Sequence, residues 1–387
     1  MRWHPCDGVI GAPPVQTAQP FQQPLNTLRE STNAVPTSNV FSAMRNTRVI
    51  ISAYGGPEVL KLIEEDLPEP SAGQVRLKVL ATGVAFADVL MRYGMYPHMP
   101  ALPFSPGYDV VGVIDKLGSG VTNFVPGDRV TAMTMIGGYA QYLCIPASEL
   151  IRVPEGVDPA EAVSLVLNYA TAHQLIHRIA DLRPEQSVLI QGAAGGVGTA
   201  LLELGQLAGL KMYGTASRSK HGLVSSLGGI PIDYKTDDFV VRILQMTRAG
   251  GVDAVFDAVG GMNWWRSYKT LRSAGKGSGG KLIGYGMSSV IERGKASKLR
   301  GAASFALLGL LGALPDGKVA RWYSITSEKK KHPEWFPEDL AHLLRLLAEK
   351  KIHPHVAERL PLREAQRAND LIEHAKVSGK IVLLPQT

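Results

Sequence analysis

Two patterns of apolar and polar residues divide the chain. Between residues 55 and 154, short runs of strand-forming residues such as 74–81 and 110–116 alternate with turns rich in Gly and Pro. From about residue 160 the apolar positions follow helical spacing, and helices then alternate with short buried strands. The first pattern predicts a partly open, mainly antiparallel β-barrel, and the second a parallel doubly wound sheet, so we expect an α/β protein.

The order of these patterns predicts the domain organisation. An amphipathic helix at 340–350, a helix at 363–374 and a last strand at 380–384 follow the alternating region and are expected to return to the barrel. We therefore predict a first domain at 44–165 that is completed by 327–387, and a nucleotide-binding domain at 166–326 with an insertion at about 287–320. The parallel strands are expected at 187–192, 211–216, 230–233, 253–257 and 281–284.

Residues 1–43 differ from the rest of the chain in composition. They are rich in Pro, Gln, Asn, Ser and Thr and show no periodic apolar pattern. Such a segment buries too little apolar surface to fold alone, and it lacks the apolar core of a signal peptide. We predict a disordered extension before a domain that starts at Met44; an arm that orders on a partner is the alternative.

The stretch 187–198 predicts a phosphate-binding turn. Val188, Leu189 and Ile190 form a buried strand, and the segment after it opens an apolar helix. Glycines let the backbone approach a pyrophosphate, and the free N–H groups and dipole of the helix favour its charge. A turn without a ligand is the alternative. The residues of this A-x-G-x-x-G pattern are Ala193, Gly195, Gly196, Val197 and Gly198.

The end of the second strand indicates which nucleotide is preferred. NAD-specific sites place Asp or Glu there, whereas this chain has Ser217, Arg218 and Lys220. These side chains can donate charge-assisted hydrogen bonds to a 2′-phosphate, which favours NADPH. Tyr234 follows the next strand and is a candidate third wall. The alternatives are solvated surface cations and an ordinary surface tyrosine.

Composition excludes several classes of protein. The 387 residues carry a net charge of +7, but the cations are dispersed and not interleaved with aromatic residues, so we do not expect a nucleic-acid binder. Cys6 and Cys144 form neither a disulfide framework nor a zinc cluster. A reducing cytoplasm fits this composition.

Several motifs together resemble a known family. They include Gly-Val-Ala-Phe-Ala-Asp at 83–88, Pro-Gly-Tyr-Asp-Val-Val-Gly at 106–112 and the glycine turn. In this order they resemble the medium-chain dehydrogenase/reductases, in the zinc-independent NADPH:quinone oxidoreductase branch that includes zeta-crystallin. The resemblance covers about 48–385 and implies a GroES-like domain joined to a Rossmann domain, with the active site between them. The other matching stretches are 92–97, 127–130, 257–260 and 378–383.

The resemblance also implies roles for individual residues. Tyr96 is the preferred donor to the substrate oxygen, while Asp88 and Arg92 orient one another or support the loop; an ion pair that merely fixes the domain is the alternative. Thr171 matches the helix at the nicotinamide end. Further cofactor positions are Gly260 and Gly284, which alternatively only permit tight turns, and Lys380, which is alternatively a surface lysine.

The residues argue against a catalytic metal. Zinc needs Cys, His and carboxylate ligands that converge, and Gly107-Tyr108-Asp109 stands where zinc-dependent relatives carry Gly-His-Glu. Without a Lewis acid, quinones and activated alkenes are the easier substrates, because conjugation spreads the negative charge onto an oxygen. The family's Asn and Tyr are replaced by Ala85 and Leu90, so a hydrophobic enone, alkenal or lipid-like substrate is expected at least as readily as a small benzoquinone.

The insertion suggests an interaction surface. Its basic part, 293–300, precedes an apolar run, 302–314, that is too short to span a bilayer. We expect a flap over the cleft or a dimer contact; the alternative is weak membrane association through 293–314, in an NADPH-binding interaction or lipid-handling protein with little catalysis. Residues 329–331 are expected in a solvated loop. By resemblance, 321–325 form an edge strand that continues the sheet across a homodimer.

Overall fold

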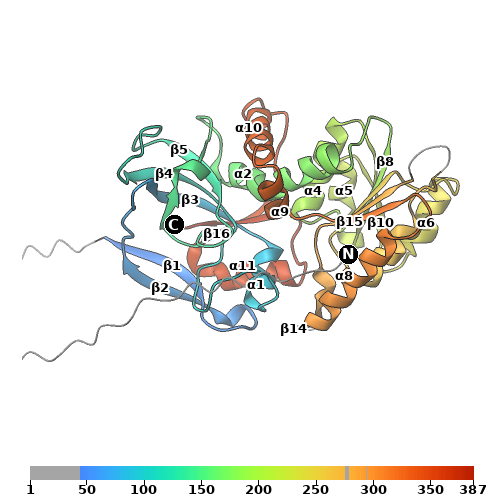
Figure 1. The fold of residues 1–387 in the computed structure, drawn as a ribbon, viewed down its shortest axis with the longest axis horizontal. Coiled ribbons are helices and arrows are strands. Elements are labelled where there is room, and N and C mark those ends of the chain that lie inside the picture. The colour runs from blue at the N-terminus through green and yellow to red at the C-terminus, as the bar shows by residue number, and fades with distance from the viewer. Residues whose placement is uncertain (1–43, 275–278, 293) are drawn as a thin grey trace, which may run out of the picture. The chain divides into compact units, whose positions relative to one another are not determined.

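Strands from both ends of the chain form the larger of the two main sheets (Figure 1). Its order is β16-β17-β3-β4-β5-β7, with β6 also paired to β3, and only β16 and β17 run parallel. The predicted mainly antiparallel architecture is confirmed. The strands are β3 (Gln74–Val84), β4 (Asp109–Leu117), β5 (Arg129–Met133), β6 (Tyr142–Pro146), β7 (Ile151–Arg152), β16 (Val356–Pro361) and β17 (Lys380–Leu384).

Alternation explains why β3 forms at the centre of this sheet. Val75, Leu77 and Val79 are fully buried, while the residues between them are partly or wholly exposed. This period of two is what a strand with one face on the core requires. A separate antiparallel hairpin, β1 (Arg45–Ile51) and β2 (Leu60–Asp66), precedes it.

The second main sheet has six parallel strands in the order β10-β9-β8-β11-β12-β15. This is the doubly wound Rossmann order, and the strand order reverses between β8 and β11. All five predicted strands are present, each within one residue of its predicted ends. The strands are β8 (Ser187–Gln191), β9 (Lys211–Ala216), β10 (Gly229–Asp233), β11 (Ala254–Asp257), β12 (Lys281–Gly284) and β15 (Val319–Trp322).

Helices connect the strands and complete both regions (Figure 1). Their bounds are α1 (Phe86–Arg92), α2 (Pro159–Ser164), α3 (Ala170–His173), α4 (Gly196–Leu207), α5 (His221–Ser226), α6 (Phe239–Met246), α7 (Met262–Lys269), α8 (Lys298–Gly312), α9 (Ile325–Lys331), α10 (Trp335–Ala348) and α11 (Ala365–Glu373). Turns of π-helix flank α3 at Leu165–Tyr169 and Gln174–Ile179. The short hairpin β13 (Ile291–Glu292) and β14 (Lys295–Ala296) precedes α8.

One local prediction is wrong. The run Lys329–Lys331 was expected in a solvated loop, but it forms the last turn of α9. Lys329 bonds Glu149, and Lys331 pairs with Glu328 one turn earlier. One partner on another element, Glu149, and one within α9, Glu328, therefore hold two of the three lysines in a helix that their sequence alone does not indicate.

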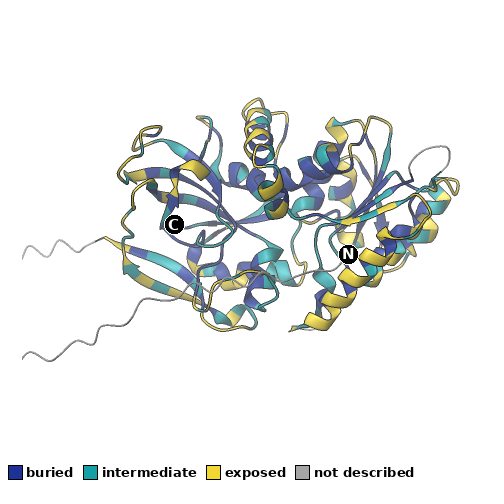
Figure 2. Cartoon of the chain, viewed as in Figure 1, coloured by how far each residue is buried: buried dark blue, intermediate teal, exposed yellow. Residues whose placement is uncertain are grey.

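The computed structural model describes residues 44–274, 279–292 and 294–387, and the predicted disordered extension lies outside them. Figure 2 shows that the strands of both main sheets are largely buried, whereas α8 presents a long exposed face. Within the described residues no helix has the length and apolar character needed to cross a membrane.

Candidate functional site

The glycine turn follows β8, at the carboxyl edge of the sheet where the strand order reverses. Gly192 has φ of +74°, and no side chain caps the first turn of α4. A Cβ at Gly196 would collide with the amide of Asn168, and a Cβ at Gly198 with the carbonyl of Gly192. Backbone N–H groups therefore stand free of side chains at a helix N-terminus, as a pyrophosphate site requires.

Ala193, in place of the usual first glycine, is accommodated from the neighbouring strand. Its methyl group is fully buried, and its N–H donates to the carbonyl of Thr215. The facing residue in β9 is Gly214, where an added Cβ would lie 2.6 Å from the Cβ of Ala193. The glycine that allows close packing here is therefore Gly214 on β9, so Ala193 fits without disturbing the turn.

The candidate 2′-phosphate loop lies at the end of β9. Arg218 is exposed, and Ser217 is half-buried with its hydroxyl 3.4 Å from that of Ser219. Lys220 is not a free surface cation, because its Nζ donates to the carbonyls of Ala375, at 2.7 Å, and Val377, at 2.6 Å. Lys220 thus ties the loop to the segment before β17, and only one of its three N–H donors is left for a phosphate.

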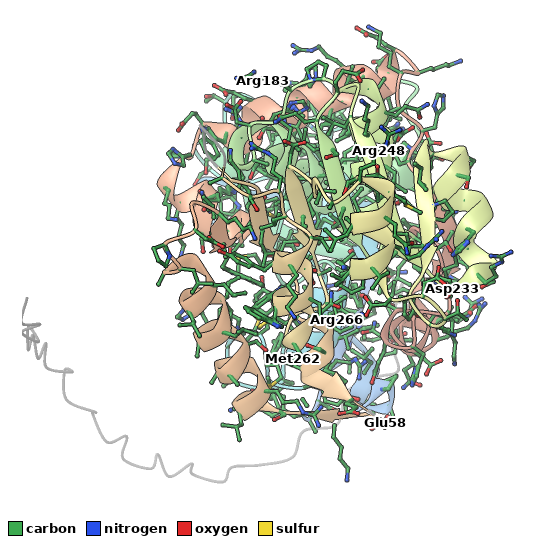
Figure 3. The ribbon with its side chains drawn as sticks, turned by 90° about the vertical axis from the view of Figure 1, so that its right-hand side faces the viewer. Glu58, Arg183, Asp233, Arg248, Met262 and Arg266 are labelled. Atoms are coloured by element: carbon green, nitrogen blue, oxygen red, sulfur yellow. The ribbon has the colours of Figure 1, made fainter. Side chains whose placement is uncertain are left out.

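A further cation, not identified from the sequence, lies near this loop. Tyr234 is 54% exposed after β10, and the following residue, Lys235, lies close enough to lower the pKa of Lys220, after the larger effect of burial. The carboxylate of Asp233, at the end of β10 (Figure 3), accepts a hydrogen bond from the Lys235 N–H at 3.0 Å. Lys235 adds positive charge where a 2′-phosphate would lie.

Tyr323 adjoins two of the residues predicted at the nicotinamide end, Thr171 and Gly284. Thr171 is buried on α3 and lies close to Tyr323, whose hydroxyl donates to Gln174 Oε1 at 2.8 Å. Gly260 has φ of +81° in a turn held by the buried carboxylate of Asp257. At Gly284 a Cβ would lie 2.7 Å from the ring of Trp264, so packing alone accounts for that glycine.

Tyr96 faces a second tyrosine that the sequence did not single out. Its hydroxyl lies 2.7 Å from that of Tyr108, and the two rings meet edge to face with centroids 6.0 Å apart. Tyr108 is 2% exposed and stands where zinc-dependent relatives carry histidine. Burial raises the pKa of both tyrosines, so both hydroxyls keep their protons at neutral pH.

Asp88 lies at the centre of a buried network behind this pair. Its carboxylate accepts from the N–H of Ala85 at 2.8 Å, the N–H of Gly107 at 3.1 Å and the hydroxyl of Tyr139 at 3.1 Å. Burial raises its pKa to about 6 against these three donors. Asp88 thereby fixes the loop that carries Tyr108 to the start of α1.

Arg92 is fully buried but is paired elsewhere. Its Nη2 lies 2.7 Å from Glu373 Oε2, and its Nε donates to Asn369 at 3.1 Å. Among the described residues no hydrogen bond or ion pair joins Asp88 to Arg92; Asn369 and Tyr139 lie between them. Asp88 and Arg92 therefore form no direct ion pair: Asp88 holds the loop before Tyr108, and Arg92 binds α1 to α11.

Lys380 forms a buried ion pair with Asp109. The distance from Nζ to Oδ2 is 2.8 Å, and the two side chains are 3% and 0% exposed, so the surface-lysine alternative is wrong. The other oxygen of Asp109 accepts from the Gly83 N–H at 2.8 Å. A carboxylate with both oxygens engaged beside a tyrosine does not fit a zinc site. In residues 44–274, 279–292 and 294–387, no group of three or more His, Cys, Asp or Glu is placed to hold a metal.

Consecutive residues connect the two ends of the site. The Gly379 N–H donates to the carbonyl of Ala194 at 2.9 Å, and Gly379 forms a parallel bridge with Gly195. Lys380 comes next and binds Asp109, which follows Tyr108 in the chain. The phosphate turn is therefore linked, through Gly379, Lys380 and Asp109, to the stretch of chain that carries Tyr108.

Comparison with known proteins agrees with this arrangement. The family described as "Alcohol dehydrogenase GroES-like domain" matches residues 71–155, and that described as "Zinc-binding dehydrogenase" matches 229–383. The synaptic vesicle membrane protein VAT-1 homolog of Rattus norvegicus is 31% identical over 357 residues, covering 87% of this chain and 83% of the relative. The 2-haloacrylate reductase of a Burkholderia species is 31% identical over 345 residues, covering 87% and 98%.

A solved structure has the same fold. The crystal structure of Escherichia coli quinone oxidoreductase complexed with NADPH superimposes with a TM-score of 0.78 at 28% identity, covering 88% of this chain and all of that one. The chain belongs to the medium-chain dehydrogenase/reductase superfamily. Within this superfamily the chain belongs to the zeta-crystallin-like branch of quinone oxidoreductases, the branch that its sequence motifs resemble.

Proposed function

We propose that this protein is an NADPH-dependent, metal-independent oxidoreductase that reduces a quinone or an α,β-unsaturated carbonyl compound. The observation that carries the proposal is the link through Gly379 and Lys380, which connects a phosphate-binding turn to the stretch that carries Tyr108, the buried partner of the half-buried Tyr96. When bound, NADPH supplies a hydride from C4 of its nicotinamide. The solved NADPH complex of the Escherichia coli relative supports the choice of cofactor.

The chain's own groups fit the cofactor from end to end. In the turn of Gly195, Gly196, Val197 and Gly198, the N–H groups of the last three residues face the pyrophosphate, because the Gly195 N–H already donates to the carbonyl of Gly192. Arg218 and Ser217 hold the 2′-phosphate. Lys220 uses its remaining donor there. Thr171 contacts the nicotinamide end, beside Tyr323.

Tyr96 supplies the polar contact to the substrate. Hydride addition to a conjugated carbon moves an electron pair onto the carbonyl oxygen, and a fixed O–H donor stabilises that oxygen most when its charge is largest. The side chains of Ala85 and Leu90 line the adjoining loop and helix without polar atoms, which favours an apolar enone or alkenal. The names of the relatives, a quinone oxidoreductase and a 2-haloacrylate reductase, support both substrate types.

Oxidation of NADPH by the full chain tests the proposal. The acceptors are 1,4-benzoquinone, 9,10-phenanthrenequinone, a long-chain 2-alkenal and an enone, with NADH in place of NADPH as the cofactor control. We expect turnover with at least one acceptor, reduced about a hundredfold or more in Tyr96→Phe because a positioned acid contributes at least that much. Tight NADPH binding without turnover in the whole panel would contradict it.

A second candidate function, binding to an anionic membrane surface with little catalysis, is favoured by the exposed face of α8. Leu299 is 80% and Leu310 63% exposed on this helix, and Lys295 and Lys298 lie at its N-terminal side. On α7, which packs against α8, Met262 is also exposed, one turn before Arg266 (Figure 3). Apolar and basic groups on one surface suit interfacial binding.

Cosedimentation with phosphatidylserine vesicles at low salt separates this candidate from the first. Leu310→Glu and Leu299→Glu should abolish cosedimentation, and Leu207→Glu should not, because Leu207 is an equally accessible leucine on α4. Absence of the wild-type protein from the vesicle pellet contradicts membrane binding.

We also propose a cytoplasmic homodimer. Strand β15 is the last strand of the six-stranded sheet, and its outer edge offers backbone groups to a second copy. Light scattering should give twice the chain mass, and Ala320→Pro in this strand should lower it.

A further inference from the structure

We infer that Lys220, Glu373 and Tyr93 couple binding of the 2′-phosphate to the position of Tyr96, so that NADPH orders the substrate end of the site and NADH does not. The inference rests on the proposed function, which places the 2′-phosphate at Lys220 and the substrate oxygen at Tyr96. Glu373 and Tyr93 act through the loop of Tyr96 and are positioning residues. One segment, residues 369–379, contacts both ends of the site.

The phosphate loop is tied to the chain that follows α11. Lys220 Nζ donates to the carbonyl of Ala375 at 2.7 Å and to that of Val377 at 2.6 Å. An ammonium group has three donors, so the third can bind a phosphate oxygen while the first two keep their carbonyls. A 2′-phosphate that holds Lys220 therefore also holds the end of α11.

The same end of α11 binds the end of α1, which lies beside it (Figure 1). The side chain of Glu373 is 5% exposed, and its Oε2 lies 2.7 Å from Arg92 Nη2. Its Oε1 accepts from the Tyr93 hydroxyl, also at 2.7 Å. Asn369, one turn earlier on α11, accepts from Arg92 Nε at 3.1 Å. Glu373 is two residues from Ala375, so the phosphate loop and α1 bind the same short stretch of chain.

Tyr96 follows α1 through a turn that is bonded to the helix. The Met95 N–H donates to the carbonyl of Leu90, within α1, at 2.8 Å. Gly94 has φ of +64°, the left-handed conformation that commonly ends a helix. Because this turn is fixed to the last residues of α1, a shift of the helix end also shifts Tyr96.

A second connection joins the two ends of the site but does not depend on the 2′-phosphate. It runs from the pyrophosphate turn through Gly379 and Lys380 to Asp109. NADPH and NADH both carry the pyrophosphate, so this connection is the same for the two nucleotides. The connection through Lys220 begins instead at the phosphate that distinguishes NADPH from NADH. A difference between the nucleotides at Tyr96 therefore isolates the connection through α11.

Adenosine 2′,5′-bisphosphate tests the coupling directly, because it carries the 2′-phosphate but has no nicotinamide that could touch Tyr96. Hydrogen–deuterium exchange of the full-length protein is measured by mass spectrometry in peptides that cover 93–97. The ligand is present at saturation, and adenosine 5′-monophosphate, which lacks the 2′-phosphate, is the comparison. We expect the bisphosphate to slow exchange in 93–97 about fivefold, the factor that one hydrogen bond contributes, and the monophosphate to leave it unchanged.

Tyr93→Phe is the matched variant, since it removes the hydroxyl that binds Glu373 and keeps the ring and all charges. It should lose most of the protection of 93–97 while its affinity for the bisphosphate stays unchanged. Tyr268→Phe is the control: it removes a hydroxyl that donates to Asp316, in another part of the fold, and should respond as the wild type does.

Two substitutions of Lys220 test the other end of the connection. Lys220→Met removes the bonds to Ala375 and Val377 and should abolish the protection of 93–97 at saturating bisphosphate. Lys220→Arg keeps the charge and several donors and should restore most of it.

Turnover gives an independent measurement. With saturating acceptor, wild-type kcat should be about fivefold higher with NADPH than with NADH, and this ratio should approach one in Tyr93→Phe with the KM for NADPH unchanged. Equal protection by the two ligands, or equal protection in wild type and Tyr93→Phe, overturns the coupling and leaves the proposed function standing. Protection by the bisphosphate without turnover of any acceptor supports the coupling and contradicts the proposed reaction. Failure of the bisphosphate to bind overturns the coupling together with the proposed phosphate site.

Discussion

The two ends of the candidate site are built in different ways. At the phosphate end the pyrophosphate turn is the backbone of one short stretch after β8, where Gly192 has a positive φ and a Cβ at Gly198 would meet the carbonyl of Gly192. The reacting end is assembled from side chains that lie far apart in the sequence: Tyr96 meets Tyr108, and Lys380 meets Asp109. A local motif can therefore be recognised from residue order, whereas a side-chain network becomes visible only when the fold brings its members together.

The largest effect on stability is expected at the buried ion pair of Lys380 and Asp109, next to the tyrosines. Lys380→Met leaves Asp109 as a buried carboxylate with only the Gly83 N–H as partner. Removing one member of a buried ion pair costs about 3 to 5 kcal/mol. We expect the free energy of unfolding to fall by about that amount in urea denaturation, with loss of turnover.

The control for this prediction neutralises both partners. Asp109→Asn combined with Lys380→Met removes both charges and keeps an amide oxygen for the Gly83 N–H, so most of the lost stability should return. Equal destabilisation in the single and double variants would show that the packing of the lysine stem, and not the ion pair, holds this end together.

A smaller effect, confined to one cofactor, is expected at the phosphate end. Arg218→Ala removes a charge-assisted donor and should weaken NADPH binding by about 2 kcal/mol while leaving NADH binding unchanged. Lys220→Ala should weaken both cofactors, because Lys220 also ties the loop to the carbonyls of Ala375 and Val377. Fluorescence titration with both nucleotides measures this difference.

Lys211→Ala is the matched control for bulk charge, since Lys211 is an exposed cation at the start of β9, the strand before this loop, and pairs with Glu185. If Arg218→Ala weakens NADH as much as NADPH, the loop does not select the 2′-phosphate.

The same contrast explains what the sequence did and did not predict. Five of the six parallel strands were predicted within one residue because each is a short buried apolar run between turns, and β17 was correctly returned to the first sheet. The edge strand expected at 321–325 is β15 at Val319–Trp322, and residue 325 already begins α9. The sequence showed Tyr108 only as the residue in place of the zinc-binding histidine. Its neighbours in the sequence do not reveal that its hydroxyl contacts the hydroxyl of Tyr96. The sequence left open a surface position for Lys380, because its buried partner, Asp109, is 271 residues away. The last turn of α9 likewise has a distant partner, since Lys329 pairs with Glu149, 180 residues away.

The buried network at the reacting end predicts a pH dependence. The pKa of Asp88 is about 6 in the folded chain, raised mainly by burial, against 3.8 for a free aspartate. The folded state therefore binds more protons between about pH 4 and 6, and the contribution of Asp88 to stability decreases as the pH rises through that window. Relative to Asp88→Asn, the wild type should gain about 1 kcal/mol of unfolding free energy at pH 5.0 compared with pH 7.5.

Urea denaturation of both proteins at the two pH values measures this difference. Only the change between pH values is used, because the amide also loses one of the acceptors of Asp88. A difference between the two proteins that stays constant with pH, or grows toward pH 7.5, would contradict the raised pKa.

The smallest expected effect concerns which substrate the reacting end prefers. Ala85 precedes α1 in an extended conformation, and its side chain lacks the amide that the family usually carries there. Ala85→Asn introduces a neutral hydrogen-bonding group, worth about 0.5 to 1.5 kcal/mol to a substrate that uses it. We expect the ratio of kcat/KM for 1,4-benzoquinone to that for a long-chain enone to rise about threefold. Ala303→Asn, at an exposed position of α8, should leave the ratio unchanged. If both variants behave alike, the loop at Ala85 does not contact the substrate, and the apolar pocket inferred from that position must be sought elsewhere along α1.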